Sequence, residues 1–573
     1  MAPSALKRFH PLVAEWFSST LGEPTAPQVE GWDHIARGRD TLIAAPTGSG
    51  KTLAAFLWAI NQLIDTAASG ELEDRTSVVY VSPLKALSND IQKNLAGPLT
   101  AIQVLAESRG SLLAEIRVAV RTGDTPAAER ARMLRRPPHI LITTPESLAI
   151  LLTAQGTREL LSTAGSVIVD EIHAVAGDKR GAHLALSLER LERLAEQRPQ
   201  RIGLSATQKP IAAIAALLTG VGTPADGAGS DGVAEDGRVD PPPERAGAGR
   251  RRRQLAKHGI TGAGTASGSM VDGATPGCAI VDVGHRRNWE LSVEVPSMPL
   301  GPIATNEISA EVYDRIAHLT GEHRSTLVFV STRRLVERVS HQLSERLGEG
   351  RVAAHHGSLS RATRLEAERG LKSGAIPVVV ATASLELGID IGHVDLVCHL
   401  GAPRSLSTLL QRIGRSGHWL AGIPRGVILP LTRDDLLQAA AAVRAVRAGE
   451  LDAIIMPVAP LDILAQQIVA IVASEGSVAE EELWRLVRRA HPYRELGRTD
   501  FDAIVLMLSE GVATRRGRRG AQLHHDRVNG VLRARRGARL AAITSGGAIP
   551  DTADYDVVED PAGTFVGKLN EDF

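Results

Sequence analysis

The sequence lacks the features that mark membrane, secreted and zinc-binding proteins. Its apolar runs are short and interrupted by charges, far below the roughly 20 residues of a membrane-spanning helix. The first residues do not show the charged start, apolar centre and small-residue cleavage site of a signal peptide. Only two cysteines occur, Cys278 and Cys398, and neither belongs to a CxxC pair, so we expect no disulfide framework and no zinc site. These absences predict a cytoplasmic protein without a membrane partner.

The chain also lacks net charge, because 65 Lys and Arg residues face 65 Asp and Glu residues. The total therefore gives no sign of a polyanionic partner, but the distribution does. Residues 511–539 hold nine arginines against a single acid, Asp526. A basic patch of this density indicates contact with phosphates or, alternatively, a solvated face.

The length of 573 residues exceeds one hydrophobic core and suggests about three to five domains. Short β-rich runs alternate with helical stretches in two regions, which predicts an α/β fold with two parallel-sheet lobes. The Gly-, Ala-, Asp- and Pro-rich segment between them predicts a disordered insertion, whose arginines at 250–253 either lie in solvent or contact nucleic acid. Three helical patterns and the arginine-rich segment then resemble a winged helix. We predict a first lobe at 1–221, the insertion at 222–277, a second lobe at 278–455, the winged helix at 456–540 and the start of a truncated domain at 541–573.

A strand-like run at 41–45 leads into PTGSGKT at 46–52 and then into an apolar helix, which is the context of a phosphate-binding loop. Glycines let backbone N–H groups close around phosphate oxygens at the positive end of the helix. Lys51 is expected to reach the β- and γ-phosphates, and Thr52 to hold Mg²⁺. The predicted ATP-binding residues of this loop are Thr47, Gly48, Ser49, Gly50, Lys51 and Thr52.

A second apolar strand ends in the sequence DEIH at 170–173, which delivers two carboxylates to the edge where open α/β sheets bind ligands. We expect Asp170 to serve Mg²⁺ and Glu171 to orient or deprotonate the attacking water. The phosphate-binding loop and the acidic motif together predict ATP and Mg²⁺ as cofactors.

Further motifs follow in a fixed order, and together they resemble the Lhr (large helicase-related) group of superfamily 2 helicases, which have two RecA-like lobes. The segments that carry the resemblance are the phosphate loop, DEIH, FSSTLGEPTAPQVEGW at 17–32, SPLKALSND at 82–90, RTGDT at 121–125, TTPESL at 143–148, LSAT at 204–207, STRRLVE at 331–337, AAHHGSLSR at 353–361, ATASLELGIDIG at 381–392 and QRIGRSGH at 411–418.

The resemblance implies roles for residues that local patterns leave unassigned. Gln28 would read adenine, while Gly388 and Asp390 would sense ribose and γ-phosphate. Arg415 would be an arginine finger and Arg412 a further ATP contact. His173, Ser205 and Thr207 would couple hydrolysis to strand binding. His418 stands where the general superfamily pattern has a last arginine, which leaves open whether Arg415 suffices alone or a protonated His418 assists.

Strand contacts are implied at six further positions, each of which also fits a structural role. As phosphate contacts they would position the strand without reading its sequence. These residues are Lys85, Arg121, Thr144, Thr332, His356 and Thr382. From the basic patch we add Arg515, Arg516, Arg518 and Arg519.

The resulting prediction is a nucleic-acid-dependent ATPase that moves 3′ to 5′ on single-stranded DNA and opens DNA and DNA:RNA duplexes in DNA repair or genome maintenance. Two alternatives stay open at this point. One is an ATP-gated clamp or annealing factor that does not unwind processively. The other is a fragment that hydrolyses ATP without moving.

Overall fold

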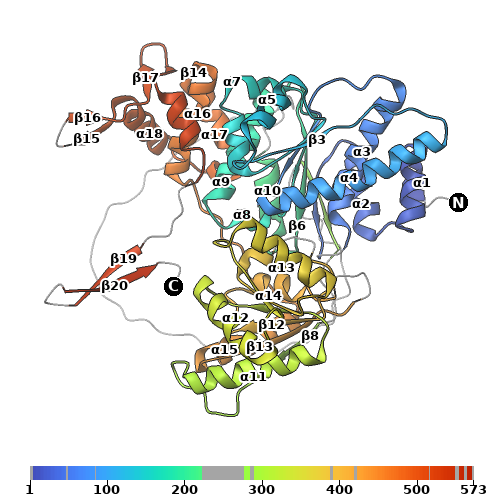
Figure 1. Ribbon diagram of the computed structural model, residues 1–573. Helices are drawn as coiled ribbons and strands as arrows, with labels where there is room; N and C mark the ends of the chain where they lie inside the picture. The colour runs from blue at the N-terminus through green and yellow to red at the C-terminus, as the bar shows by residue number, and fades with distance from the viewer. Residues whose placement is uncertain are drawn as a thin grey trace, which may run out of the picture. The chain divides into compact units, whose positions relative to one another are not determined.

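The computed structural model (Figure 1) describes most of the chain, in ten segments. They are residues 4–46, 49–83, 85–221, 277–283, 289–386, 391–417, 422–514, 517–548, 554–559 and 564–570. The segment predicted as a disordered insertion therefore lies outside the described residues, apart from its last residue, Gly277.

The first lobe contains a seven-stranded sheet with the order β3-β4-β2-β5-β6-β1-β7. All its neighbouring strands run parallel. The strands are β1 (Asp40–Ala44), β2 (Val78–Val81), β3 (Val118–Arg121), β4 (Ile140–Thr143), β5 (Ser166–Val169), β6 (Gln200–Ser205) and β7 (Cys278–Asp282). The helices of this lobe are α1 (Pro11–Thr20), α2 (Ala26–Ala36), α3 (Lys51–Ser69), α4 (Lys85–Ser108), α5 (Ala127–Arg135), α6 (Pro145–Leu151), α7 (Gln155–Ser162), α8 (His173–Ala176), α9 (Lys179–Leu194) and α10 (Ile211–Thr219).

One predicted boundary is wrong. We predicted that the second lobe starts at residue 278. Instead, β7 pairs with β1 along its whole length, from Asp40 opposite Cys278 to Ala44 opposite Asp282. The first sheet thus recruits its edge strand from beyond residues 222–276. The second sheet starts only at Glu290.

The second lobe contains a six-stranded parallel sheet with the order β10-β11-β9-β12-β13-β8. Its strands are β8 (Glu290–Val293), β9 (Thr326–Phe329), β10 (Val352–His355), β11 (Val378–Ala381), β12 (Leu396–Leu400) and β13 (Arg425–Leu429). Its helices are α11 (Asn306–Glu322), α12 (Arg333–Leu347), α13 (Arg361–Ser373), α14 (Leu406–Ile413) and α15 (Arg433–Ala448), with the short 3₁₀ helix η2 (Ala383–Leu385) after β11. The predicted α/β fold with two parallel-sheet lobes is confirmed.

The C-terminal part folds as helices around small antiparallel sheets, as a winged helix requires. Its helices are α16 (Leu461–Glu475), α17 (Glu480–Arg489), α18 (Arg498–Glu510) and α19 (Ala538–Thr544). A three-stranded sheet joins β14 (Ser477–Ala479), β18 (Val531–Ala534) and β17 (Leu523–Asp526). Two further hairpins pair β15 (Val512–Thr514) with β16 (Gly517–Arg519) and β19 (Asp554–Glu559) with β20 (Thr564–Asn570). The arginine-rich segment thus forms two hairpins, β15–β16 and β17–β18.

The winged helix shares a hydrophobic core with the first lobe. Alternate residues of β2 enter different cores, because Val79 and Val81 face one side of the sheet and Val78 and Tyr80 the other. The core on the Val79 side also contains Leu188 of α9 and many winged-helix residues, among them Ile468, Tyr493 and Phe501. The two cores of the second lobe consist of residues from that lobe alone.

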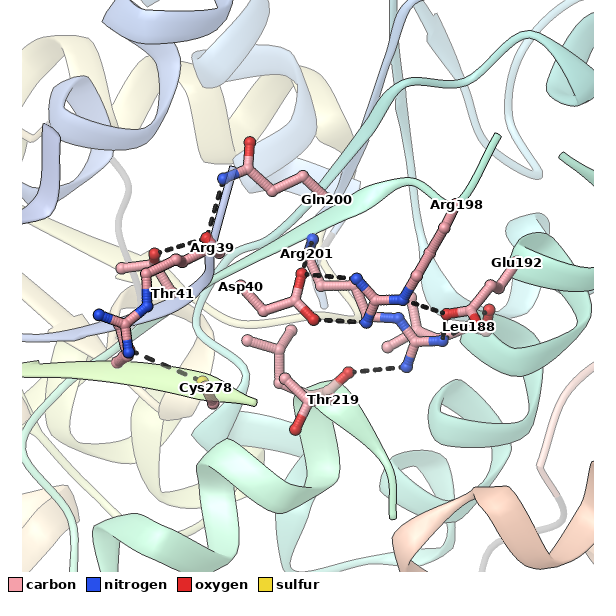
Figure 2. A network of polar contacts seen from close by, with 12 residues as sticks. Arg39, Asp40, Thr41, Leu188, Glu192, Arg198, Gln200, Arg201, Thr219 and Cys278 are labelled. Atoms are coloured by element: carbon pink, nitrogen blue, oxygen red, sulfur yellow. Dashed lines mark hydrogen bonds and ion pairs between the residues drawn. The ribbon is translucent and has the colours of Figure 1, made fainter. Parts of the chain in front are cut away.

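An ion-pair network reinforces this junction, and Figure 2 shows its first-lobe part, with Asp40, Arg198, Arg201 and Glu192. Arg201 on β6 is 2% exposed and donates to Glu189 at 2.8 Å and to Glu192 at 2.7 Å, both on α9. Asp40, the first residue of β1, accepts from the Arg201 backbone N–H at 2.8 Å and pairs with Arg198 at 2.5 Å. The same two glutamates bind Arg489 of α17. One set of charges therefore ties the start of β1 to the winged helix.

Candidate nucleotide site and nucleic-acid interface

The phosphate-binding loop connects β1 to α3 at the carboxyl edge of the first sheet. Gly50, with a φ of 80°, caps α3 without a side chain, which leaves the first N–H groups of the helix available to a ligand. Lys51 is 5% exposed, and its Nζ lies 3.5 Å from Glu171 Oε1 and 3.5 Å from the Ala45 carbonyl oxygen. Thr52 is the second residue of α3. Thr47 and Gly48 lie outside the described residues.

Gln28 is held against this loop. Its Oε1 accepts from the Thr25 backbone N–H at 2.9 Å, and its Nε2 donates to the Gly50 carbonyl oxygen at 3.3 Å. The Thr25 hydroxyl donates to the Ser49 carbonyl oxygen at 2.9 Å. A Cβ on Gly50 would lie 2.6 Å from Gln28 Nε2, and the φ of 80° at this position favours glycine. The two predicted nucleotide motifs are thus in direct contact, while the adenine-reading role of Gln28 stays a prediction.

The two carboxylates follow β5 as predicted, and both are buried, with Asp170 3% and Glu171 6% exposed. The Tyr80 hydroxyl donates to Asp170 Oδ2, and the Glu171 backbone N–H donates to Asp170 Oδ1 at 2.8 Å. Burial and the neighbouring Glu171 charge raise the pKa of Asp170 to about 7. Burial acts to raise the pKa of Glu171 too, but the positive charge of Lys51 leads the opposing interactions, and the net pKa is lowered. Glu171 also has a φ of 44°, a strained conformation that non-glycine residues adopt mainly at functional sites.

The donor set fits magnesium held together with a nucleotide. No group of three or more His, Cys, Asp or Glu side chains suited to a metal occurs among the described residues. Mg²⁺ at phosphoryl-transfer sites needs only one or two protein oxygens, because phosphates and water supply the rest. The Thr52 hydroxyl at the start of α3 and the Asp170 carboxylate after β5 provide such a pair.

The second lobe contributes two buried arginines that differ in their contacts. Arg412 on α14 donates to Glu386 Oε1 at 2.6 Å, contacts His399 Nε2 at 2.5 Å and lies 5.1 Å from the centre of the Phe329 ring. Arg415 is 2% exposed and donates to the Glu386 carbonyl oxygen at 2.7 Å. Burial lowers the pKa of the Arg415 guanidinium to about 10, while the negative charge of Glu171 acts to raise it.

This difference separates the two predicted roles. The charges of Arg415 and Glu171 interact across the two lobes, which agrees with the predicted arginine finger, a role that stays a prediction. Arg412 is engaged inside its own lobe and therefore fits a residue that shapes the loop after β11. Gly388 and Asp390 of that loop, and His418, lie outside the described residues.

Two of the three predicted coupling residues, His173 and Ser205, lie in contact, and His173 also contacts the second lobe. His173 Nδ1 accepts from the Ala206 backbone N–H at 3.2 Å and lies 3.3 Å from Ser205 Oγ. Its Nε2 lies 2.7 Å from the Gln411 amide of α14. Burial lowers the pKa of His173 to about 4, so the ring is neutral. Because Nδ1 accepts, Nε2 carries the proton and donates to Gln411 when that amide presents its oxygen to the ring. The buried Thr207 hydroxyl has no hydrogen-bond partner in the described part of the chain.

The predicted strand contacts follow the carboxyl ends of strands in both lobes. Thr144 and Thr332 cap α6 and α12, where their hydroxyls accept from Ser147 and Leu335 backbone N–H groups at 3.4 and 3.2 Å. Thr382 stands at the start of η2. Helix N-termini of this kind suit phosphate oxygens.

The other strand candidates already have protein partners or lie partly outside the description. Arg121, the last residue of β3, donates to the Thr122 carbonyl oxygen at 2.7 Å. His356 Nε2 lies 2.6 Å from Glu337 Oε1. Lys85 begins α4 and Arg518 and Arg519 lie on β16, but their side chains are outside the described residues, as are Arg515 and Arg516 entirely.

Comparison with known proteins places this geometry in a family. Residues 25–214 match the DEAD/DEAH box helicase family, residues 309–419 the helicase conserved C-terminal domain, and residues 444–573 the winged helix domain of the large helicase-related protein. The Lhr helicase/probable uracil glycosylase of Mycolicibacterium smegmatis is 40% identical over 99% of this chain, and the ATP-dependent helicase Lhr-Core of Methanocaldococcus jannaschii is 40% identical over 98%. The chain belongs to the Lhr family.

A solved structure supports the same conclusion. The Mycobacterium smegmatis helicase Lhr bound to ssDNA and AMP-PNP matches 96% of this chain with 41% identity and a TM-score of 0.79. The chain spans 36% of the length of the first relative, 59% of the second and 63% of the solved chain. No helix in the described part of this Lhr chain is long and apolar enough to cross a membrane.

The structure also shows Lhr residues that sequence reasoning missed. Tyr80 reads as one more apolar residue of a strand, and nothing local reveals its bond to Asp170. Glu386 and Gln411 lie inside the recognised segments 381–392 and 411–418, so the resemblance contained the signal, but their partners are set by the fold. Arg180 on α9 lies outside every recognised motif.

Proposed function

We propose that this Lhr chain is a nucleic-acid-dependent ATPase that moves 3′ to 5′ on single-stranded DNA and separates DNA and DNA:RNA duplexes. The observation that carries the proposal is that the acidic motif after β5 contacts the second lobe: His173 Nε2 lies 2.7 Å from the Gln411 amide, and the charge of Glu171 interacts with that of Arg415. A site assembled from two lobes gives hydrolysis a means to open and close them. Family membership agrees with this reading, and the ssDNA and AMP-PNP of the solved relative indicate the ligand classes.

The residues of the nucleotide site divide the work. Bound Mg²⁺ and ATP supply the reacting phosphoryl group and the cation that neutralises its charge. Lys51 binds the β- and γ-phosphates, Thr52 and Asp170 hold the cation, and Gln28 binds the base. Glu171 orients the attacking water, helped by a pKa that keeps its carboxylate ionised.

Arg415 stabilises the charge that builds on the transferred group. Its burial removes the screening by water that would weaken this interaction. Glu386 presents Arg415 through its backbone carbonyl and fixes Arg412 through its carboxylate. His173 and Gln411 connect the same two lobes beside the site.

The strand is proposed to lie along the carboxyl edges of both sheets, at the capped starts of α6 and α12. Contacts to phosphates at Thr144 and Thr332 would be independent of base sequence. The arginine-rich hairpins of the winged helix would add contacts to the phosphate backbone. Action on DNA in repair or genome maintenance, in the cytoplasm, completes the proposal.

The first test is ATP turnover with and without single-stranded DNA, in wild type and Lys51→Ala. We expect DNA to stimulate the wild type and neither condition to support turnover in the variant. Turnover that ignores DNA would contradict the proposal. Stimulated turnover without separation of a tailed duplex would instead indicate an ATP-gated clamp.

A further inference from the structure

Arg180 lies at the point where three functional segments of the first lobe meet. It is the second residue of α9, the helix that follows DEIH after one turn of α8. Its Nε donates to Glu146 Oε1 on α6 at 2.7 Å, and its Nη2 donates to the Pro83 carbonyl oxygen at 2.8 Å. Its backbone N–H donates to Asp178 Oδ1 at 2.7 Å.

Each partner belongs to a segment that the proposed function uses. Glu146 is two residues beyond Thr144, the strand contact that caps α6. Pro83 comes two residues before Lys85, where the strand-contact helix α4 begins. One side chain therefore holds both strand-binding segments, which lie 97 and 34 residues away from it along the chain.

The helices that connect Arg180 to the hydrolytic carboxylates are closely packed. A Cβ on Gly181 would lie 2.5 Å from the Val175 carbonyl oxygen, so α8 and α9 pack as closely as a glycine allows. The Ile172 backbone N–H, next to Glu171, donates to the Leu204 carbonyl oxygen of β6 at 3.0 Å. Arg180 is thus joined to the segment that holds Asp170 and Glu171 through closely packed backbone.

The chemistry of the side chain suits this position. A guanidinium donates from Nε and Nη2 in fixed directions within one plane, whereas an ammonium is a single rotating point charge. Burial acts to raise the pKa of Glu146, but the hydrogen bond and charge of Arg180 lower it, which indicates a carboxylate that stays paired. The Arg180 side chain is 31% exposed, so an ordinary pair there would contribute little to stability.

We infer that Arg180 is a positioning residue that couples strand binding at the starts of α4 and α6 to the hydrolytic carboxylates. The inference rests on the proposed function, because it requires that strand and nucleotide bind this chain. It adds a residue that touches neither ligand. Because coupling between two sites is reciprocal at equilibrium, it is measured as the change in strand affinity that a nucleotide causes.

The test measures the anisotropy of a fluorescein-labelled oligothymidylate with and without AMP-PNP and Mg²⁺, in wild type, Arg180→Ala and Arg180→Lys. We expect AMP-PNP to change the strand affinity of the wild type. In both variants, the factor by which AMP-PNP changes strand affinity should be about 10-fold smaller than in the wild type, which is the size of an ordinary coupling between sites. Their melting temperature should stay close to wild type.

The neighbouring residue provides the matched control. Lys179 pairs with Asp462 of α16 at 3.0 Å, so Lys179→Ala removes a charge from the same turn of α9 without touching α6 or Pro83. It should keep the wild-type coupling. Glu146→Gln removes the charge of the Arg180 partner on α6 and should lose part of the coupling. If Arg180→Ala does not fold, this variant tests the inference in its place.

The outcomes separate this inference from the proposed function. Wild-type coupling in Arg180→Ala, full rescue by Arg180→Lys, or an equal loss in Lys179→Ala would each overturn the role of Arg180. A wild-type chain that binds no strand, or whose strand affinity ignores AMP-PNP, would overturn the proposed coupling itself.

Discussion

The two lobes have the same kind of sheet but different relations to the rest of the molecule. The first lobe merges its core with the winged helix and ties β1 to α17 through buried charges. The two hydrophobic cores of the second lobe contain residues of that lobe alone. Its contacts with the first lobe include the polar pair His173–Gln411 and the backbone bridge between Lys209 and Ala453. We therefore expect the winged helix to move with the first lobe, and the second lobe to move against both.

The largest expected effect comes from the first lobe's own chemistry. Lys51→Ala and Glu171→Gln should both abolish ATP turnover, the first by removing the charge on the phosphates and the second by removing the base that orients water. Nucleotide binding should distinguish them, since only Lys51→Ala loses a phosphate contact. Near wild-type turnover in Glu171→Gln would show that another group activates the water.

The second lobe's contribution is expected to be smaller but still large. Arg415→Ala should lower turnover by about 10³, as loss of an arginine finger does, with less effect on nucleotide affinity. Arg412→Ala is the matched comparison, because Arg412 is held by Glu386 and His399 within its lobe. Equal losses in steady-state turnover for the two variants would remove the distinction between them.

The junction with the winged helix should dominate stability. Arg201→Met removes the arginine that pairs with buried Glu189 and partly buried Glu192, so we expect a loss of about 3 kcal/mol in the free energy of unfolding. Arg315→Ala removes a half-exposed pair with Glu294 in the second lobe and should cost less than about 1 kcal/mol. Urea denaturation followed by circular dichroism compares them. A small loss in Arg201→Met would mean that the junction is not held by this network.

Acid should weaken both lobes through their buried histidines, whereas Asp170 in the first lobe, whose pKa is raised to about 7, acts in the opposite direction. Burial lowers the pKa of His173 and His183 in the first lobe, and of His399 in the second, to about 4. The pKa of each histidine is lower in the folded state than in the unfolded state. The contribution of the neutral ring to the free energy of unfolding is therefore complete above pH 6.5 and is lost as the pH falls toward 4. Between pH 7.5 and 5.5 each costs about 1 kcal/mol. His183→Gln should therefore reduce the drop in melting temperature over this interval, and an unchanged drop would contradict the assignment.

The smallest predicted effect concerns the hairpins of the winged helix. Replacing Arg515, Arg516, Arg518 and Arg519 with alanine should weaken strand binding and flatten its dependence on salt by up to about four units, because each phosphate contact releases counterions. Turnover without nucleic acid should not change. An unchanged salt slope would leave strand binding to the two lobes.

Local sequence patterns predicted the strands, the phosphate loop and the acidic pair, because each of these depends on residues close together in the chain. The edge strand β7 was missed because it joins β1 across more than 200 residues of sequence, and no local pattern records that pairing. The same holds for Tyr80 and Arg180, whose partners Asp170 and Pro83 lie 90 and 97 residues away. The family resemblance predicted Arg415. Only the fold shows that Arg412 binds the Glu386 carboxylate, whereas Arg415 binds the Glu386 backbone carbonyl.

The most direct test of the central claim is separation of a 3′-tailed and a 5′-tailed DNA duplex by the wild-type chain with ATP and Mg²⁺, with Glu171→Gln as the control. We predict that the wild type opens the 3′-tailed duplex, leaves the 5′-tailed duplex closed, and that the control opens neither. Hydrolysis of ATP without opening of either duplex would contradict the claim that this chain converts closure of its two lobes into movement along a strand.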